Sequence, residues 1–225
     1  MSYLEKKYHK IYKEKTTPRI YKAFKNVKLE DGIGIREANA IDDYYSPESQ
    51  EYQEERAKDE RNDWRKVMNM IESWDGEYNS AVPCFMDVKG LRFFLPVLLS
   101  LGYFGELEIW TEYIVEEPKN STNEKYKEMW NGLSFEQKIC FLECMEQQFL
   151  LEADSIFEYK NSICDSCGKI RNKNFTKEEA KKYVYDGNAE FYQLVLQLKE
   201  ITIKNEKAGS KAFSFFYSLL EKFLS

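Results

Sequence analysis

The sequence contains a single histidine, His9, among 225 residues. A Ser-His-Asp or Cys-His catalytic arrangement would have to use this residue, and nothing in the lysine-rich segment around it supports that role. A di-iron site between helices requires Glu-x-x-His pairs, which one histidine cannot supply. The scarcity of histidine therefore argues against several classes of enzyme.

Long hydrophobic runs and a basic excess are also missing. The longest apolar stretch, residues 91–101, is interrupted by Arg92, Pro96 and Ser100, so it is too short to span a bilayer. No signal-peptide pattern opens the sequence. The formal net charge is -6, whereas a general nucleic-acid binder needs a dominant basic field. We therefore expect a cytoplasmic protein without membrane or direct nucleic-acid contacts.

Cysteine is sparse, and the count of five is odd. Without a secretion signal, this predicts reduced thiols. Cys164 and Cys167 form a Cys-x-x-Cys-Gly turn, which is half of a zinc knuckle. Cys140 and Cys144, four residues apart on a predicted helix, are the only pair that could complete a zinc site. The alternative is four ordinary thiols and no cofactor.

Apolar residues are nevertheless plentiful, at 43% of the chain with 16% aromatics, so a sizeable core is expected. Helical periodicity dominates and predicts an all-α fold: a compact multi-helix main domain over 1–157 and a C-terminal helical extension over 158–225. Only residues 201–203 have strand character, which leaves room for one short strand pair. The predicted helices span residues 3–15, 18–24, 35–44, 47–70, 88–101, 106–115, 134–151, 188–204 and 210–224.

Charge is unevenly distributed along the chain. Residues 1–28 hold nine Lys or Arg and two Glu, a net +7, while residues 29–60 hold three Lys or Arg and eleven Asp or Glu, a net -8. Such segments either pair within the fold or form a surface for a partner of opposite charge. The carboxylates predicted to bind a partner are Asp42, Asp43, Glu48, Glu51, Glu55 and Asp59.

Three of these carboxylates also permit a different hypothesis. Glu51, Glu55 and Asp59 are spaced i, i+4 and i+8 on the helix predicted over 47–70, so they would share one face. Carboxylates placed together can bind a divalent ion or act as acid and base. The alternatives are a metal-dependent enzyme and an ordinary solvated face.

Arg92 is the one charged residue inside the most apolar predicted helix. A buried guanidinium requires a carboxylate partner. We therefore predict a structural ion pair between Arg92 and Asp42, Asp59 or Asp87.

Several short motifs occur in an order that resembles an uncharacterised bacterial domain family of unknown function. They are Ala23-Phe24, Glu37-Ala38, Ile41-Asp42, Arg56, Asp59-Glu60, Trp64, the block FMDVKGLRFFLP at residues 85–96, and a Leu-Ser-x-x-Gln helix start at Ser134. The resemblance covers about residues 20–150. It implies a small cytoplasmic protein but no activity, and many similar families act as immunity proteins or accessory factors beside toxins.

Together these features favour a soluble, non-enzymatic binding protein. Its sharper form is an immunity-type inhibitor whose acidic surface covers a basic toxin. The alternatives are the metal-dependent enzyme and a structural subunit of a larger assembly.

Overall fold

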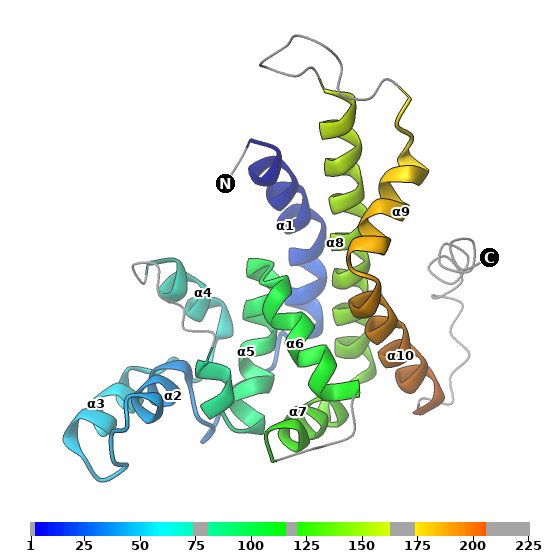
Figure 1. Ribbon diagram of the computed structural model, residues 1–225. Helices are drawn as coiled ribbons and strands as arrows, with labels where there is room; N and C mark the ends of the chain where they lie inside the picture. The colour runs from blue at the N-terminus through cyan, green and yellow to red at the C-terminus, as the bar shows by residue number, and fades with distance from the viewer. Residues whose placement is uncertain (1–2, 74–80, 116–120, 163–173, 206–225) are drawn as a thin grey trace. The chain divides into compact units, whose positions relative to one another are not determined.

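The computed structural model describes residues 3–73, 81–115, 121–162 and 174–205 (Figure 1). Within these ranges all regular secondary structure is helical, which confirms the all-α prediction. The helices are α1 (Tyr3–Ala23), α2 (Ile35–Asp42), α3 (Gln50–Lys58), α4 (Trp64–Ser73), the 3-10 helix η1 (Val82–Phe85), α5 (Val88–Leu101), α6 (Phe104–Val115), α7 (Ser121–Gly132), α8 (Phe135–Asn161), α9 (Lys177–Gly187) and α10 (Ala189–Asn205).

The chain divides into two compact units. Unit 1 comprises Met1–Thr16 and Phe141–Ser225, and unit 2 comprises Thr17–Cys140. The division therefore falls inside α1 and α8, each of which contributes to both units. The division into 1–157 and 158–225 expected from the sequence is a different one and stays a prediction.

Unit 2 is built around α5. This helix packs against α4, α6 and α7 (Figure 1), and all its residues from Phe93 to Leu101 are buried. Asp87 caps its first turn by accepting the amide hydrogen of Gly90, and Gly102 ends it in the left-handed conformation, with φ 71°. Both ends are as the sequence predicts, because Asp accepts from the first turn and Gly adopts positive φ without a steric penalty.

Trp64 connects the start of α4 to the end of α1. Its indole Nε1 donates to the carbonyl of Phe24 at 3.0 Å, and its ring meets that of Tyr21 edge-on at 5.2 Å. Trp64 is 2% exposed, so this contact is part of the core of unit 2. The predicted break between residues 15 and 18 is wrong, because α1 continues through Pro18 to Ala23.

The single helix predicted over 47–70 is two helices. Ser49 caps the first by accepting from the amide of Tyr52, and α3 ends at Lys58. Asp59 then takes an extended conformation, with ψ 129°, and α4 begins only at Trp64. The interruption separates Asp59 from the helical face that carries Glu51 and Glu55.

Unit 1 contains the greater part of α8 together with α9 and α10. Phe149 of α8 and Tyr192 of α10 pack edge-to-face with their centroids 4.7 Å apart. Thr176 and Glu179 form a capping box at the start of α9. Residues 201–203 lie in α10, so the short strand that the sequence allowed there does not form: helical packing outweighs the weak strand preference of this short β-branched stretch.

In the part of the chain that the structure describes, no helix combines the length and apolar character that a membrane crossing requires.

Candidate functional site

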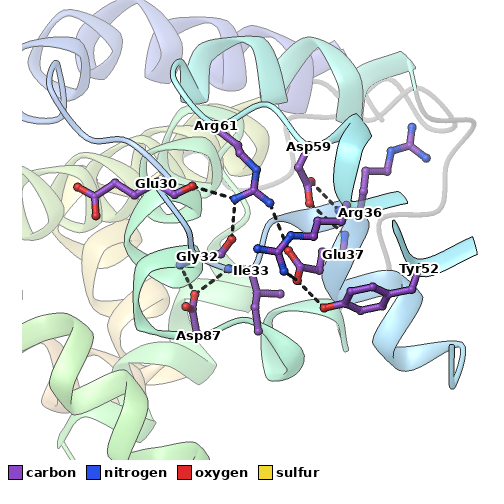
Figure 2. A network of polar contacts seen from close by, with 11 residues as sticks. Glu30, Gly32, Ile33, Arg36, Glu37, Tyr52, Asp59, Arg61 and Asp87 are labelled. Carbon is purple, nitrogen blue, oxygen red and sulfur yellow. Dashed lines mark hydrogen bonds and ion pairs between the residues drawn. The ribbon is translucent and has the colours of Figure 1, made fainter. Parts of the chain in front are cut away.

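The first turn of α2 is capped by Asp59, the residue that directly follows the last turn of α3. Asp59 accepts the amide hydrogen of Arg36 at 2.9 Å and that of Glu37 at 3.1 Å (Figure 2). These amides are in the first turn, where a helix offers no acceptor of its own, and Gly34 at the N-cap has no side chain to serve. Asp59 can reach them because the chain leaves the helical path there. The carboxylate also suits the positive end of the helix dipole.

Close approach of the backbone makes this cap possible. A Cβ on Gly34 would overlap the carboxylate of Asp59. On its other side Asp59 borders a cavity of about 10 Å³, whose apolar wall includes Val67, Phe93 and Phe94. The carboxylate is therefore placed between two amide donors and an apolar wall.

The pKa of Asp59 reflects this placement. Burial raises it from 3.8 to about 6, while the two amide hydrogen bonds and the charge of Arg61 act in the opposite direction. The nearby charge of Glu37 adds to the increase. Asp59 thus changes protonation state near neutral pH, unlike an ordinary aspartate.

Glu37 is the most deeply buried acidic side chain of this region, with 1% of its side chain exposed. It accepts hydrogen bonds from the hydroxyl of Tyr52 and from Arg56 at 2.8 Å, both on α3. Arg61 approaches its other oxygen at 3.4 Å. Since a buried carboxylate requires charged or polar partners, these three side chains hold α2 and α3 together.

Arg61 also supports the loop that precedes α2. Its guanidinium donates to the carbonyls of Glu30 at 2.9 Å and Gly32 at 3.1 Å, and Figure 2 shows it between this loop and Glu37. Asp87 accepts from the amide of Ile33 at 3.0 Å as well as capping α5. The loop is thereby connected to the start of α5. We call the set Glu37, Tyr52, Arg56, Asp59, Arg61 and Asp87 the polar joint.

Of the six carboxylates predicted to bind a partner, the structure leaves five near the surface. Asp43, Glu48 and Glu51 are exposed, and Asp42 and Glu55 are partly exposed. Glu55 forms ion pairs with Lys58 and, at 3.8 Å, with Arg36. Asp59 is the exception, because its carboxylate serves as the cap of α2.

Two tyrosines stand at the turn between α2 and α3, beside these carboxylates. Tyr44 is 95% exposed and has a left-handed backbone, with φ 63°. Its amide donates to Ile41 and that of Tyr45 to Ala40, both at 3.0 Å, which is the hydrogen-bond pattern of a Schellman turn. Glycine is the usual residue at such a position, so an exposed tyrosine there is unexpected. We call residues 42–48 the tyrosine tip.

The ion-pair prediction for Arg92 assumed burial, and that assumption is wrong. Arg92 is exposed, although its neighbours on α5 are buried. Two of the three aspartates proposed as its partners accept backbone amides instead, Asp59 from α2 and Asp87 from Ile33 and Gly90. An arginine can occupy an apolar helix without burial when it projects from the one solvated side.

The two other predicted ligand sets are not assembled in the described part of the chain. Cys140 and Cys144 are buried on α8, while Cys164 and Cys167 lie outside the described residues. No group of three or more metal-ligating side chains occurs within the described ranges. In particular, Glu51, Glu55 and Asp59 do not share a helical face.

Unit 1 has an open hollow of about 490 Å³ lined in part by Tyr8, Asp154, Glu158 and Lys177. Lys177 lies 3.5 Å from Asp154, and Glu158 accepts from Tyr8 at 2.9 Å and pairs with Lys7. Its acidic groups are thus matched by basic ones. The hollow favours neither sign of ligand.

Sequence reasoning assigned no role to Glu37, Arg61 or Tyr44. Glu37 and Asp59 belong to the family-like motifs. Four of the six residues of the polar joint, Glu37, Arg56, Asp59 and Asp87, lie in these motifs. Arg61 and Tyr44 gave no comparable signal, because nothing local distinguishes a partly buried arginine from a solvated one, or a left-handed tyrosine from a helical one.

Comparison with curated proteins yields no match, and comparison with solved structures yields none either. A family model, described as a family of unknown function (DUF6714), matches residues 13–155. This range is more than half of the chain and contains the whole polar joint and the tyrosine tip. The chain belongs to this family of unknown function, DUF6714.

Proposed function

We propose that this chain is a non-catalytic binding protein that docks a basic protein through the tyrosine tip. The observation that carries the proposal is Tyr44, which is almost fully exposed and held in a backbone conformation unfavourable for a tyrosine. Tyrosine contributes large contact area with little loss of side-chain freedom and is enriched at interfaces. A backbone outlier of this kind is a reason to suspect a functional position.

The charge around Tyr44 supports a basic partner. Asp42, Asp43, Glu48 and Glu51 lie within seven residues of it in the sequence, with Tyr45, 42% exposed, beside it. Complementary charge of this kind accelerates association and makes it sensitive to salt. In its sharper form, the proposal is an immunity-type inhibitor that covers the basic surface of a toxin.

The rival proposal of a metal-dependent enzyme has less support. It required Glu51, Glu55 and Asp59 on one face, whereas Asp59 faces the first turn of α2. Its direct test is metal analysis of the purified protein: stoichiometric metal that is lost in Glu55→Gln would restore it. The structural-subunit alternative is tested by light scattering, in which a stable homo-oligomer would support it.

The docking proposal is tested by charge reversal. The chain is immobilised and incubated with extract of its native host, and any captured protein is identified and titrated at several salt concentrations. Asp42→Lys, Asp43→Lys and Glu48→Lys together are expected to weaken binding at least tenfold, and Tyr44→Ala alone to weaken it severalfold.

A matched control reverses the same amount of charge elsewhere in unit 2. Glu108, Glu112 and Glu128 are exposed on α6 and α7, so converting them to lysine changes the net charge equally without touching the tip. If the control variant loses binding as strongly as the tip variant, only net charge matters and the tyrosine tip is not the docking surface.

A further inference from the structure

The last turn of α1 and the residues that follow it form a basic counterpart of the tyrosine tip. Residues 22–28 contain Lys22, Lys25 and Lys28 and no acidic residue, a formal charge of +3, whereas the tip contains three acidic residues and no basic one, a formal charge of -3. We call residues 22–28 the lysine turn. We propose that the lysine turn of one copy of this chain docks on the tyrosine tip of a second copy. This inference rests on the proposed function, because it uses the same tip.

Buried neighbours hold the lysine turn in place. Phe24, Val27 and Leu29 are buried. The carbonyl of Phe24 accepts from Trp64 at 3.0 Å, and the amide of Leu29 donates to the carbonyl of Arg61 at 2.9 Å. Because the buried residues interleave with the lysines, all three lysines are exposed. The backbone of the turn is therefore fixed before a partner binds, which reduces the ordering cost of docking.

The lysine turn and the tip do not neutralise each other within one chain. Among the described residues, the lysines of the turn take part in none of the ion pairs. At the tip, Asp43 accepts from the side-chain amide of Asn39 at 3.2 Å and Glu48 from the hydroxyl of Ser46. Both segments belong to unit 2, so the packing of this unit does not bring them together. Opposite charges that do not pair inside a fold are available to a partner of opposite charge.

A second copy of the chain fits both surfaces. It carries the matching charge, and it is present wherever the chain itself is present. Tyr44, 95% exposed, offers a ring face to which an ammonium group of the lysine turn can bind. Tyr21, 37% exposed, directly precedes the turn and adds aromatic surface to the other side of the contact.

The contact joins different surfaces of the two copies. Each end of an associated pair therefore keeps one tip or one lysine turn unoccupied, and association either closes into a ring or continues as a chain. Its charge pairs lie at the surface, so salt weakens them. This salt sensitivity distinguishes the contact from the stable homo-oligomer of the structural-subunit alternative. A basic partner of another kind has to compete with further copies of the chain for the tip.

Sedimentation velocity of the purified chain tests the contact. At about 0.01 M salt, where charges act over roughly 30 Å, the average mass is expected to rise with protein concentration. At about 1 M salt, where they act over roughly 3 Å, the chain is expected to be monomeric. A chain that stays monomeric at low salt, or an oligomer that persists at high salt, would overturn the proposal.

Two variants that each lack one surface give the sharper test. The tip-neutral variant carries Asp42→Asn, Asp43→Asn and Glu48→Gln, and the turn-neutral variant carries Lys22→Gln, Lys25→Gln and Lys28→Gln. Each variant alone is expected to be monomeric. Mixed in equal amounts at low salt, they should form a dimer and nothing larger, because only one charged tip and one charged turn remain to pair. Absence of this dimer would overturn the proposal even if the unmodified chain associates.

A matched control removes the same amount of positive charge elsewhere in unit 2. Lys58, Lys89 and Arg92 are exposed and lie outside the lysine turn, so converting all three to glutamine changes the net charge as in the turn-neutral variant. The control should associate as the unmodified chain does. If it is instead monomeric at low salt, net charge governs association and the proposal is wrong.

Two further outcomes separate this inference from its neighbours. If the chain stays monomeric at low salt but binds vesicles containing phosphatidylserine, and the turn-neutral variant does not, the lysine turn serves a membrane surface and the proposal is overturned. Self-association without any protein captured from the host would contradict only the proposed docking of a basic toxin. A captured basic protein without self-association would contradict only this inference.

Discussion

The polar joint and the tyrosine tip use the same residue types in opposite ways. Both contain carboxylates and tyrosine, and both lie on or beside α2 and α3. In the joint, Glu37 is 1% exposed and is bonded by Tyr52, Arg56 and Arg61. At the tip, Tyr44 is 95% exposed. The difference teaches that an acidic segment cannot be treated as one surface, because each carboxylate is buried or solvated according to the donors that distant segments bring to it.

The largest expected effect is a loss of stability when the polar joint is disrupted, which a substitution at the tyrosine tip should not cause. Glu37→Ala removes the shared acceptor of Arg56, Arg61 and Tyr52, and we expect the free energy of unfolding to fall by about 3 kcal/mol. This loss is at the lower end of the range for breaking a buried ion pair, since Arg56 is 40% exposed and can be rehydrated. Urea denaturation followed by tryptophan fluorescence measures the change.

The control for this prediction comes from the tip. Glu48→Ala removes the same type of side chain from an exposed position, and we expect a change below about 0.5 kcal/mol. Equal losses from the two substitutions would mean that the joint and the tip do not differ as the structure indicates.

A smaller effect tests the close contact beneath the cap. Gly34→Ala places a methyl group against the carboxylate of Asp59, so we expect a loss of about 2 kcal/mol from overpacking and from displacement of the cap. Gly105→Ala is the matched control, because no atom lies within 4 Å of the added Cβ and alanine favours the helix by about 0.5–1 kcal/mol. Thermal unfolding should therefore shift in opposite directions for the two variants.

The smallest effect concerns the tip. Tyr44→Gly relieves the left-handed backbone, and we expect the free energy of unfolding to rise by about 1 kcal/mol. Tyr45→Gly, at a position without positive φ, should instead lower it. Greater stability in Tyr44→Gly combined with weaker partner binding would show that the tyrosine is retained for recognition. A loss of stability would mean that its side chain supports the fold.

Much of the fold was predictable from local signals. Apolar periodicity identified α5 and α8, and the residues that cap them, Asp87 and the Ser134–Gln137 pair, lie where expected because a capping bond joins neighbours in the sequence. The same reasoning gave a wrong result for residues 47–70, where it predicted one helix in place of α3 and α4. Helical propensity there continues through Asp59, and only the unsatisfied amides of α2 explain why the chain leaves the helix.

The sequence singled out most residues of the polar joint, but it did not predict which contacts they make. The family-like motifs contained Glu37, Arg56, Asp59 and Asp87, yet their spacing suggested a solvated face and an ion pair with Arg92. The structure assigned Asp59 and Asp87 to backbone amides, since an amide that has no helical acceptor must find one elsewhere when it is enclosed.

The sequence by itself determined the helical class, several helix ends, the acidic balance of residues 29–60 and membership of the family, because these depend on residue type and on neighbours within a few positions. Tertiary structure alone decided which carboxylates are buried and where Tyr44 points. Burial of Glu37 depends on donors 15, 19 and 24 residues away in the chain, and their proximity exists only after the helices have packed.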